Sequence, residues 1–211
     1  MRLPPPLDFL GSVRLNMRLA MAASVSGNSH CMLGPAGGIV LTCVKSPRRS
    51  SLNLQADQPR TGARMFKHIL IPTDGSRLAA KAIKAGVEMA KEMGAKVTGY
   101  CAQEPVPTHL YGEGYVADKQ MIAEFERRAR EHAETSVEEI AAAAKARGVP
   151  FTALVTKSNV PSRGIIEAAE RRKCDVIFMA SHGYRGLTGL LLGSVTQEVL
   201  THSEIPVLVF R

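Results

Sequence analysis

Short apolar segments alternate with helical segments from residue 67 to the end of the chain, and this alternation restricts the possible folds most strongly. The apolar segments, which have the length and composition of strands, lie at 67–72, 96–102, 151–156, 175–180 and 206–210. The segments between them show apolar residues at helical steps of three and four or other helix signals, and they lie at 77–94, 118–147, 162–172 and 194–203. We therefore expect the order β-α-β-α-β-α-β-α-β.

This order predicts a parallel sheet. Strands that are apolar along most of their length and are separated by helices belong to sheets buried on both faces. Right-handed crossovers then distribute the helices over the two faces. The predicted fold class is α/β, with a doubly wound five-stranded parallel sheet sandwiched by helices. Ligands bind such sheets at the carboxyl ends of the strands, where the strand order reverses.

The first 64 residues are a different kind of sequence. They are rich in proline, glycine, serine and arginine, and neither a helical nor a strand period persists in them. We expect residues 1–64 to be a disordered basic extension and residues 65–211 to be one domain. Translation that begins at Met65 is one interpretation of the extension. A targeting segment is another, because the composition is similar to that of organellar transit peptides.

The net charge and the cysteine positions limit the kinds of binding partner and the cellular compartment that the sequence is consistent with. Residues 1–64 contain eight basic and two acidic side chains, so this segment carries +6 of the chain's net charge of +8. The nearly neutral remainder argues against nucleic acid as a partner, and no segment is long and apolar enough to predict a membrane span. Cys101 and Cys174 lie in apolar segments without metal-type spacing, so we interpret them as buried side chains in a reducing, cytoplasmic compartment.

A glycine-rich stretch, "SHGYRGLTGLLLGSV" at 181–195, follows the fourth predicted strand. It lacks the lysine of a P-loop, and its glycines do not have the spacing of a dinucleotide-binding loop. It leads into Gly193 and Ser194 at the start of a predicted helix, where unpaired backbone N–H groups and the helix dipole favour an anion. The stretch is either a phosphate-binding loop or a turn in which Ser194 only caps the helix, since Ser194 and Gln197 have capping-box spacing.

Two polar residues near the strand ends are further candidates. Asp74 follows the first strand, and either it or Ser76 caps the next helix, or its carboxylate accepts hydrogen bonds from a ribose or an adenine amino group. A carboxylate repels phosphates, so Asp74 belongs at the nucleoside end of such a ligand; a metal ion is the remaining alternative for it. His182 has no accompanying nucleophile elbow or catalytic triad order, so we interpret it as a ligand contact rather than a base.

Joined together, these segments resemble the universal stress protein family over residues 65–211. The resemblance rests on "ILIPTDGS", "DVIFMASHG", "LLLGSVTQEVL" and the terminal "PVLVF". One branch of this family binds ATP through a glycine, two residues, a glycine, nine residues, and then Gly-Ser or Gly-Thr. Gly183 and the pair Gly193-Ser194 match this pattern, whereas Ala180 replaces its first glycine.

The resemblance implies an adenine-nucleotide α-hydrolase-like fold that is commonly dimeric, with ATP and accompanying Mg²⁺ as ligands. It implies a nucleoside pocket in which Cys101 flanks the adenine, lined by Pro72, Thr73, Asp74, Cys101, Met179 and Ala180. It also implies a phosphate site with Ser194 and the Gly193 backbone at its centre, made by Gly183, Gly193, Ser194, Val195 and Thr196.

Three classes of function follow. The first is a stress-response regulatory protein in which ATP changes conformation or the choice of protein partner, with slow hydrolysis at most, because no residue is placed as a general base. The second is a nucleotide-independent dimeric interaction module, for which Ala180 is the main support. The third is an adenylating or phosphoryl-transfer enzyme of similar fold.

The last predicted strand, within 205–211, indicates how two copies of the chain associate. It begins at Pro206, is apolar throughout and ends the chain, so we expect it at or near a sheet edge. An exposed apolar edge strand promotes unwanted pairing unless it is covered. We expect the same strand of a second copy to cover it through a two-fold contact, which gives a homodimer.

Overall fold

The computed structural model of the chain describes residues 39–42, 66–107, 119–183 and 192–211. Its elements are β1 (Ile39–Thr42), β2 (His68–Pro72), α2 (Arg77–Met93), β3 (Lys96–Gln103), α3 (Lys119–Arg147), β4 (Phe151–Lys157), α4 (Pro161–Arg171), β5 (Val176–Ala180), α5 (Ser194–His202) and β6 (Val207–Phe210). From β2 onward, strands and helices alternate, which confirms the predicted order.

The strands form one sheet in the order β1-β6-β5-β2-β3-β4. The five strands from β6 to β4 are parallel, as predicted. The chain runs from β2 outward to β4 and then crosses back to β5 on the other side of β2. The strand order therefore reverses between β2 and β5, and their carboxyl ends lie side by side.

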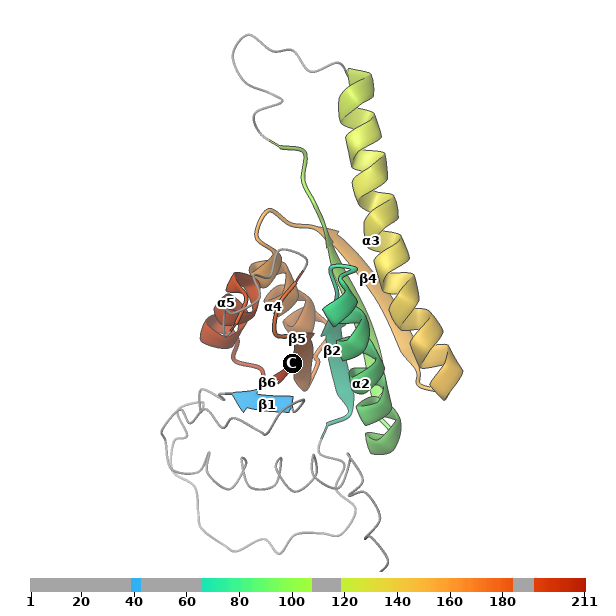
Figure 1. Cartoon of the computed structure of the whole chain (residues 1–211), viewed down its shortest axis with the longest axis vertical. Helices are drawn as coiled ribbons and strands as arrows, with labels where there is room; N and C mark the ends of the chain where they lie inside the picture. Colours follow the sequence, from blue (N-terminus) through green and yellow to red (C-terminus); the bar gives the residue numbers. More distant parts are fainter. Residues whose placement is uncertain (1–38, 43–65, 108–118, 184–191) are drawn as a thin grey trace, which may run out of the picture.

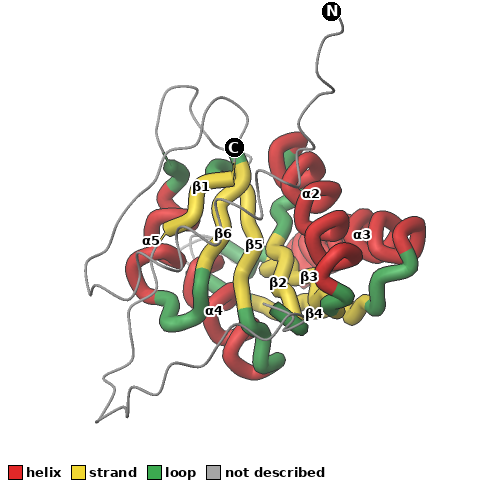
Figure 2. Tube along the Cα trace, turned by 90° about the horizontal axis from the view of Figure 1, so that it is seen from below, coloured by secondary structure: helices red, strands yellow, loops and turns green. Residues whose placement is uncertain are grey.

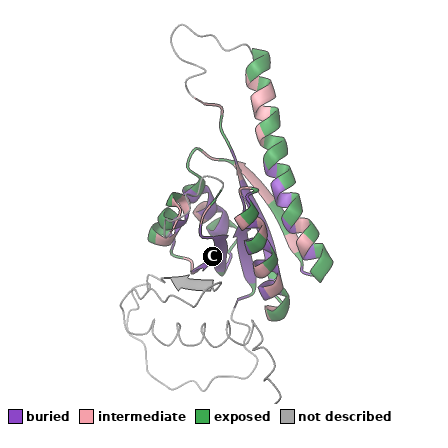
Figure 3. Ribbon diagram, viewed as in Figure 1, coloured by how far each residue is buried: buried purple, intermediate pink, exposed green. Residues whose placement is uncertain are grey.

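Helices cover both faces of this sheet (Figures 1 and 2). Ile69 and Ile71 of β2 and Phe178 of β5 belong to a core cluster that includes residues of α2 and α3. Leu70 and Ile177 belong to a second cluster, which includes residues of α4 and α5. Because successive strand residues face opposite sides of a sheet, the core consists of two layers, and the central strands are buried between them (Figure 3).

Strand β1 is a difference from the sequence analysis, which predicts no strand within residues 1–64. It pairs with β6 in antiparallel orientation (Figure 1). The last strand therefore lies at the edge of the five parallel strands, but its outer side carries a strand of the same chain. Only four residues pair, and the sequence around them is rich in glycine and proline. No periodic pattern of apolar residues therefore predicts this strand. The rest of 1–64 lies outside the described residues, and its predicted disorder stays a prediction.

Helix α3 extends beyond the sheet that it covers (Figures 1 and 3). Its 29 residues span about 44 Å, whereas the eight residues of β3 span about 26 Å. Its buried side chains begin at Ala133, and Met121 is 49% exposed although the apolar period continues through it. Within the described parts of the chain, no helix combines the length and the apolar character needed to cross a membrane.

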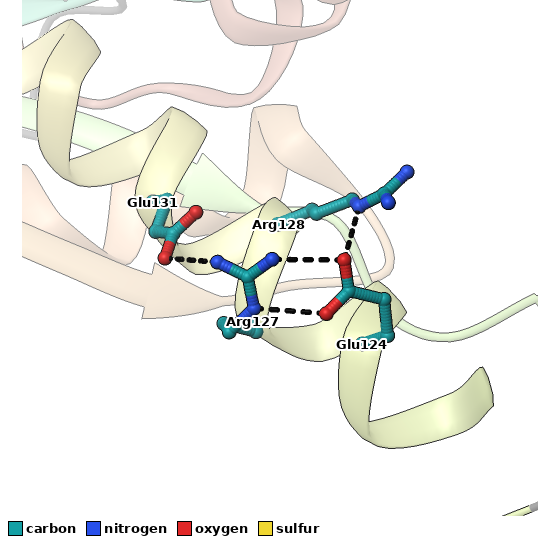
Figure 4. A network of polar contacts seen from close by, with 4 residues as sticks. All are labelled: Glu124, Arg127, Arg128 and Glu131. Carbon is teal, nitrogen blue, oxygen red and sulfur yellow. Dashed lines mark hydrogen bonds and ion pairs between the residues drawn. The ribbon is translucent and has the colours of Figure 1, made fainter. Parts of the chain in front are cut away.

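The projecting end of α3 carries a network of ion pairs (Figure 4). Glu124 accepts hydrogen bonds from Arg127 and Arg128, and Arg127 also donates to Glu131. The guanidinium groups of Arg127 and Arg128 lower the pKa of Glu124 to about 2. All four side chains are exposed, so these pairs support the helix locally and contribute little to global stability.

Candidate functional site

The two motifs that the sequence analysis singled out meet at the carboxyl ends of β2 and β5. These strands pair in parallel through Ile69 with Val176 and Leu70 with Ile177. Beyond the strand ends, Gly183 lies against Asp74: a Cβ atom added to Gly183 would lie 2.5 Å from Asp74 Oδ2. A glycine at this position therefore permits the backbone after β5 to approach the carboxylate after β2.

The turn after β2 holds Asp74 in place. Asp74 Oδ1 accepts a hydrogen bond of 3.1 Å from the Ser76 N–H, and Thr73 Oγ1 accepts one from the Gly75 N–H. Gly75 has a φ of +75°, which favours glycine. Ser76, rather than Asp74, caps α2, because Ser76 Oγ accepts the Ala79 N–H. Asp74 is half-buried, and its carboxylate is positioned by its own turn.

Two hydrogen bonds join the beginning of α5 to the end of β5. The Gly193 N–H donates to the Ser181 carbonyl at 2.8 Å, and Thr196 Oγ1 donates to the Ala180 carbonyl at 3.0 Å. The family resemblance implies a phosphate site centred on the Gly193 backbone, but the Gly193 N–H group donates its hydrogen bond within the protein. The Thr196 hydroxyl is engaged in the same way. These two bonds fix the amino end of α5 beside the carboxyl end of the sheet.

The first turn of α5 leaves other donors available. Gly193 is the N-cap, with φ −70° and ψ 154°, and no side chain caps the helix. Among the described residues, none accepts a hydrogen bond from the N–H groups of Ser194, Val195 or Thr196. Ser194 is the first helical residue and is exposed, so the interpretation that it only caps the helix is wrong. Three backbone donors and the positive end of the helix dipole remain for an anion.

His182 lies against this helix end. Its Nδ1 is 3.1 Å from Ser181 Oγ, and a Cβ atom added to Gly193 would lie 3.8 Å from its Cδ2. Its Nε2 is buried and has no hydrogen-bond partner within the parts of the chain that the structure describes. Buried polar atoms normally have partners, so this nitrogen is a group that a bound ligand can satisfy.

Cys101 lies in β3, two residues before its carboxyl end, and interacts electrostatically with Asp74. It is 3% exposed. The pKa of its thiol is raised to about 11, chiefly by burial and then by the Asp74 carboxylate, while a hydrogen bond with Ser136 lowers it. Burial also raises the pKa of Cys174 to about 11. Both thiols are therefore neutral at ordinary pH, which agrees with their interpretation as buried, unreactive side chains.

Two residues of α3 approach the site without having been predicted. A Cβ atom added to Gly75 would lie 3.0 Å from Ser136 Oγ and 3.3 Å from His132 Cε1. The buried Ser136 donates its hydroxyl to the His132 carbonyl at 2.8 Å. Their spacing of four residues places both on one side of the helix, but only the packing of α3 against β3 and α2 brings that side to the turn after β2.

The remaining predicted site residues are buried strand ends. Pro72 ends β2, and Met179 and Ala180 end β5. Met179 and Ala180 belong to different core clusters, on opposite faces of the sheet. The methyl group of Ala180, which stands where the family pattern has glycine, is thus part of the core beside α2, and the residue is 8% exposed. Most of the spacer between Gly183 and Gly193 lies outside the described residues.

Comparison with known proteins identifies the relatives of this domain. The model of the universal stress protein family matches residues 65–211. Universal stress protein MJ0531 of Methanocaldococcus jannaschii is 33% identical over 153 residues, which are 72% of this chain and 86% of that protein. The universal stress protein in QAH/OAS sulfhydrylase 3'region of Thermus aquaticus is 33% identical over 147 residues, which are 70% of this chain and 100% of the relative.

A solved structure shows the same architecture. The structure of hypothetical protein MJ0577, from Methanocaldococcus jannaschii, superposes with a TM-score of 0.59 and 27% sequence identity. The superposition covers 69% of this chain and 96% of that one. Nearly the whole of that protein thus corresponds to about two thirds of this chain.

Proposed function

The chain belongs to the universal stress protein family, and on this premise we propose that it is a stress-response regulatory protein that binds ATP at the carboxyl ends of β2 and β5. One observation carries the proposal. The first turn of α5 offers three backbone donors without partners among the described residues, next to the buried, unpartnered Nε2 of His182.

The phosphate end of the site is the amino end of α5. The N–H groups of Ser194, Val195 and Thr196 would donate to phosphate oxygens, and the exposed Ser194 hydroxyl would add a fourth donor. His182 Nε2 would donate from the adjacent loop. A side chain at Gly183 would meet the Asp74 carboxylate, and a side chain at Gly193 would lie against Ser181 and His182. The Mg²⁺ that accompanies ATP would bind with the phosphates.

The nucleoside end is the turn after β2. Asp74 carries a carboxylate fixed by the Ser76 N–H, and this carboxylate would accept hydrogen bonds from ribose hydroxyls or an adenine amino group. Placing it there keeps its charge away from the phosphates. The neutral Cys101 thiol and the strand ends at Pro72, Thr73 and Met179 would provide the apolar wall against which an adenine packs.

We propose that the bound nucleotide is a signal and that its hydrolysis is slow. An efficient hydrolase needs a general base placed near the attacking water. The Asp74 carboxylate is tied into its own turn, and the Cys101 thiol is neutral. We further propose that the protein acts in the cytoplasm through protein partners, rather than through nucleic acid or a membrane, which the small net charge of residues 65–211 supports.

We propose that the domain is able to form a homodimer through β6, within 205–211. The residues Val207, Leu208 and Val209 are buried and apolar. Such a strand is a surface for pairing with another strand when its outer side is free. In this structure β1 lies on that side, so dimerisation through β6 requires β1 to leave.

A nucleotide-independent interaction module is the second candidate. Two observations favour it: Ala180 replaces a glycine of the ATP-binding pattern, and the Gly193 N–H is engaged by Ser181. Acid extraction of the purified full chain separates the two candidates. Adenine nucleotide in the extract, together with saturable ATP binding in calorimetry with Mg²⁺, supports the nucleotide-binding protein. Failure of both measurements leaves the interaction module.

Replacing Ser194 by proline tests the phosphate end without breaking the helix. Proline is favoured at the first helical position, and Gly193, at φ −70° and ψ 154°, has a conformation compatible with a following proline. The substitution removes one N–H donor and the hydroxyl, whereas the matched Ser194→Ala removes the hydroxyl alone. We expect Ser194→Pro to weaken ATP binding by about 1.5–3 kcal/mol and Ser194→Ala to weaken it less. Equal affinities for Ser194→Pro and the wild type in calorimetry would exclude α5 as the phosphate site.

Replacing Asp74 by asparagine tests the nucleoside end. Asparagine keeps an oxygen that accepts the Ser76 N–H, so the turn is retained while the charge is lost. We expect ATP affinity to fall by about 1–3 kcal/mol, the loss of a charge-assisted hydrogen bond, with little change in melting temperature. Titration calorimetry and thermal unfolding of the same samples check this, and an unchanged affinity contradicts the assignment of Asp74.

A further inference from the structure

Strand β1 closes the outer edge of β6. Four residue pairs join the two strands in antiparallel register: Ile39 with Phe210, Val40 with Val209, Leu41 with Leu208 and Thr42 with Val207. On its inner side β6 pairs with β5. Without β1, the outer backbone N–H and C=O groups of an apolar strand would be unpaired, which is the condition under which sheets bind further strands.

A second copy of β6 would need the same edge in the same orientation. A two-fold axis beside an edge strand relates that strand to its copy in antiparallel direction. The strand β1 is also antiparallel to β6. It therefore uses the same outer hydrogen-bonding groups of β6 that an isologous partner would use, and the two cannot bind together.

We propose that β1 is a built-in substitute for the partner strand, so that the full chain is monomeric and a second copy pairs through β6 only when β1 is displaced. This inference rests on the proposed dimerisation through β6 and is independent of the proposed nucleotide site. The strand β1, within the amino-terminal extension, thus controls assembly. It covers the outer edge of β6, and a second copy of this chain binds that edge when β1 is displaced.

The connection between β1 and β2 is long enough for this role. In the sheet, β1 is three strands from β2, a lateral distance of about 14 Å. The residues from 43 to 67 could span roughly 80 Å if extended, so the tether permits β1 to reach β6 of its own chain.

Mass action favours the tethered strand. A segment tethered to its binding site has an effective concentration on the order of millimolar, whereas a second copy is present at micromolar concentration in the test below. With comparable pairing per strand, β1 is favoured by roughly a hundredfold to a thousandfold. Forming one dimer would also break two pairings of β1 with β6, one in each copy, and would gain only one pairing between the two copies of β6.

Two adjacent prolines in β1 test the proposal in the full chain. Successive residues of a strand direct their N–H groups to opposite sides, so either Val40 or Leu41 directs its N–H group towards β6. The double variant Val40→Pro with Leu41→Pro therefore removes this donor, whichever of the two residues supplies it. We expect the wild type to sediment as a 22.7 kDa monomer and the double variant as a particle of twice that mass at micromolar concentration. The matched control, Leu52→Pro with Asn53→Pro, places two prolines in the same extension outside β1 and should remain monomeric.

A peptide of residues 37–44, with serine in place of Cys43, provides the second measurement. Added in excess to the double variant, it should occupy β6 and restore the monomer, and the same peptide with prolines at positions 40 and 41 should not. If the variant aggregates, the wild-type peptide must still return it to the monomer. A double variant that stays monomeric with an unchanged melting temperature overturns the proposal, as does a wild type that already dimerises equally well. ATP titration of the same samples reports on the nucleotide site separately.

Discussion

Replacing Gly193 by valine is expected to abolish ATP binding while leaving the fold intact. The backbone of Gly193, at φ −70° and ψ 154°, lies in the extended region that β-branched residues prefer. A Cβ atom there would meet the Ser181 carbonyl and the His182 Cα at 3.4 Å, which are ordinary contacts. We expect the two methyl groups of valine, beyond this Cβ atom, to crowd His182 and the first turn of α5, where the phosphates are proposed to bind.

The expected loss of affinity for Gly193→Val is about a hundredfold or more, because more than one charge-assisted hydrogen bond of about 1.5–3 kcal/mol would be lost. Gly193→Ala is the matched control: it adds a single methyl group and should give an intermediate affinity. Titration calorimetry measures binding, and thermal unfolding verifies that the variants are folded. Wild-type affinity in a folded Gly193→Val variant would refute the phosphate site at α5.

Replacing Gly164 by alanine is expected to destabilise the domain, although alanine normally stabilises a helix relative to glycine. Gly164 lies inside α4, where alanine should gain about 1 kcal/mol from helix propensity. However, a Cβ atom at Gly164 would overlap the hydroxyl of Tyr100 and lie 3.1 Å from Ser158 Cβ. Tyr100 is 1% exposed, and its hydroxyl is hydrogen-bonded to Thr156 at 2.9 Å. The side chain therefore cannot move away without losing this bond.

We expect Gly164→Ala to lower the free energy of unfolding by about 1–3 kcal/mol, the usual effect of overpacking. In a Tyr100→Phe background the overlapping oxygen is absent, so the same substitution should be neutral or stabilising. Denaturant unfolding of the four proteins in this double-mutant cycle measures the coupling between the two positions. Additive effects of the two substitutions would show that the hydroxyl does not limit the space at Gly164.

The meeting of Asp74 and Gly183 could be predicted from the sequence because it follows from topology. Once strands and helices alternate, the rule for parallel sheets places ligands where the strand order reverses. The two motifs follow the strands that flank this point, and the structure brings Gly183 against Asp74. No knowledge of side-chain packing is needed for this step.

Features that depend on particular packing could not be predicted. The bond from the Gly193 N–H to the Ser181 carbonyl joins residues twelve positions apart, and Gly193 rather than Ser194 is the N-cap of α5. Similarly, His132 and Ser136 reach the site only because α3 packs beside the turn after β2. In the sequence they are two polar residues beside an apolar stripe, as on many solvated helices.

Strand β1 cannot be predicted from its own residues for a different reason. Strand formation depends on the neighbouring strand more than on the residue's own preference, and the partner of Ile39 is Phe210, at the other end of the chain. The helical period of α3 likewise says nothing about where the sheet beneath the helix ends. Met121 continues the period, but the sheet does not extend beneath it.

The central position of β2 has a consequence for how the protein is made. Synthesis proceeds from the amino end, so β2, β3 and β4 leave the ribosome before β5. His68 donates its backbone N–H to Asp175, 107 residues further on, and β2 cannot complete its pairing before that part of the chain appears. Until then, an unfinished chain exposes the apolar edge of β2 and has neither Gly183 nor α5. A bound nucleotide at this site would therefore mark a chain in which β5 and α5 have already joined β2.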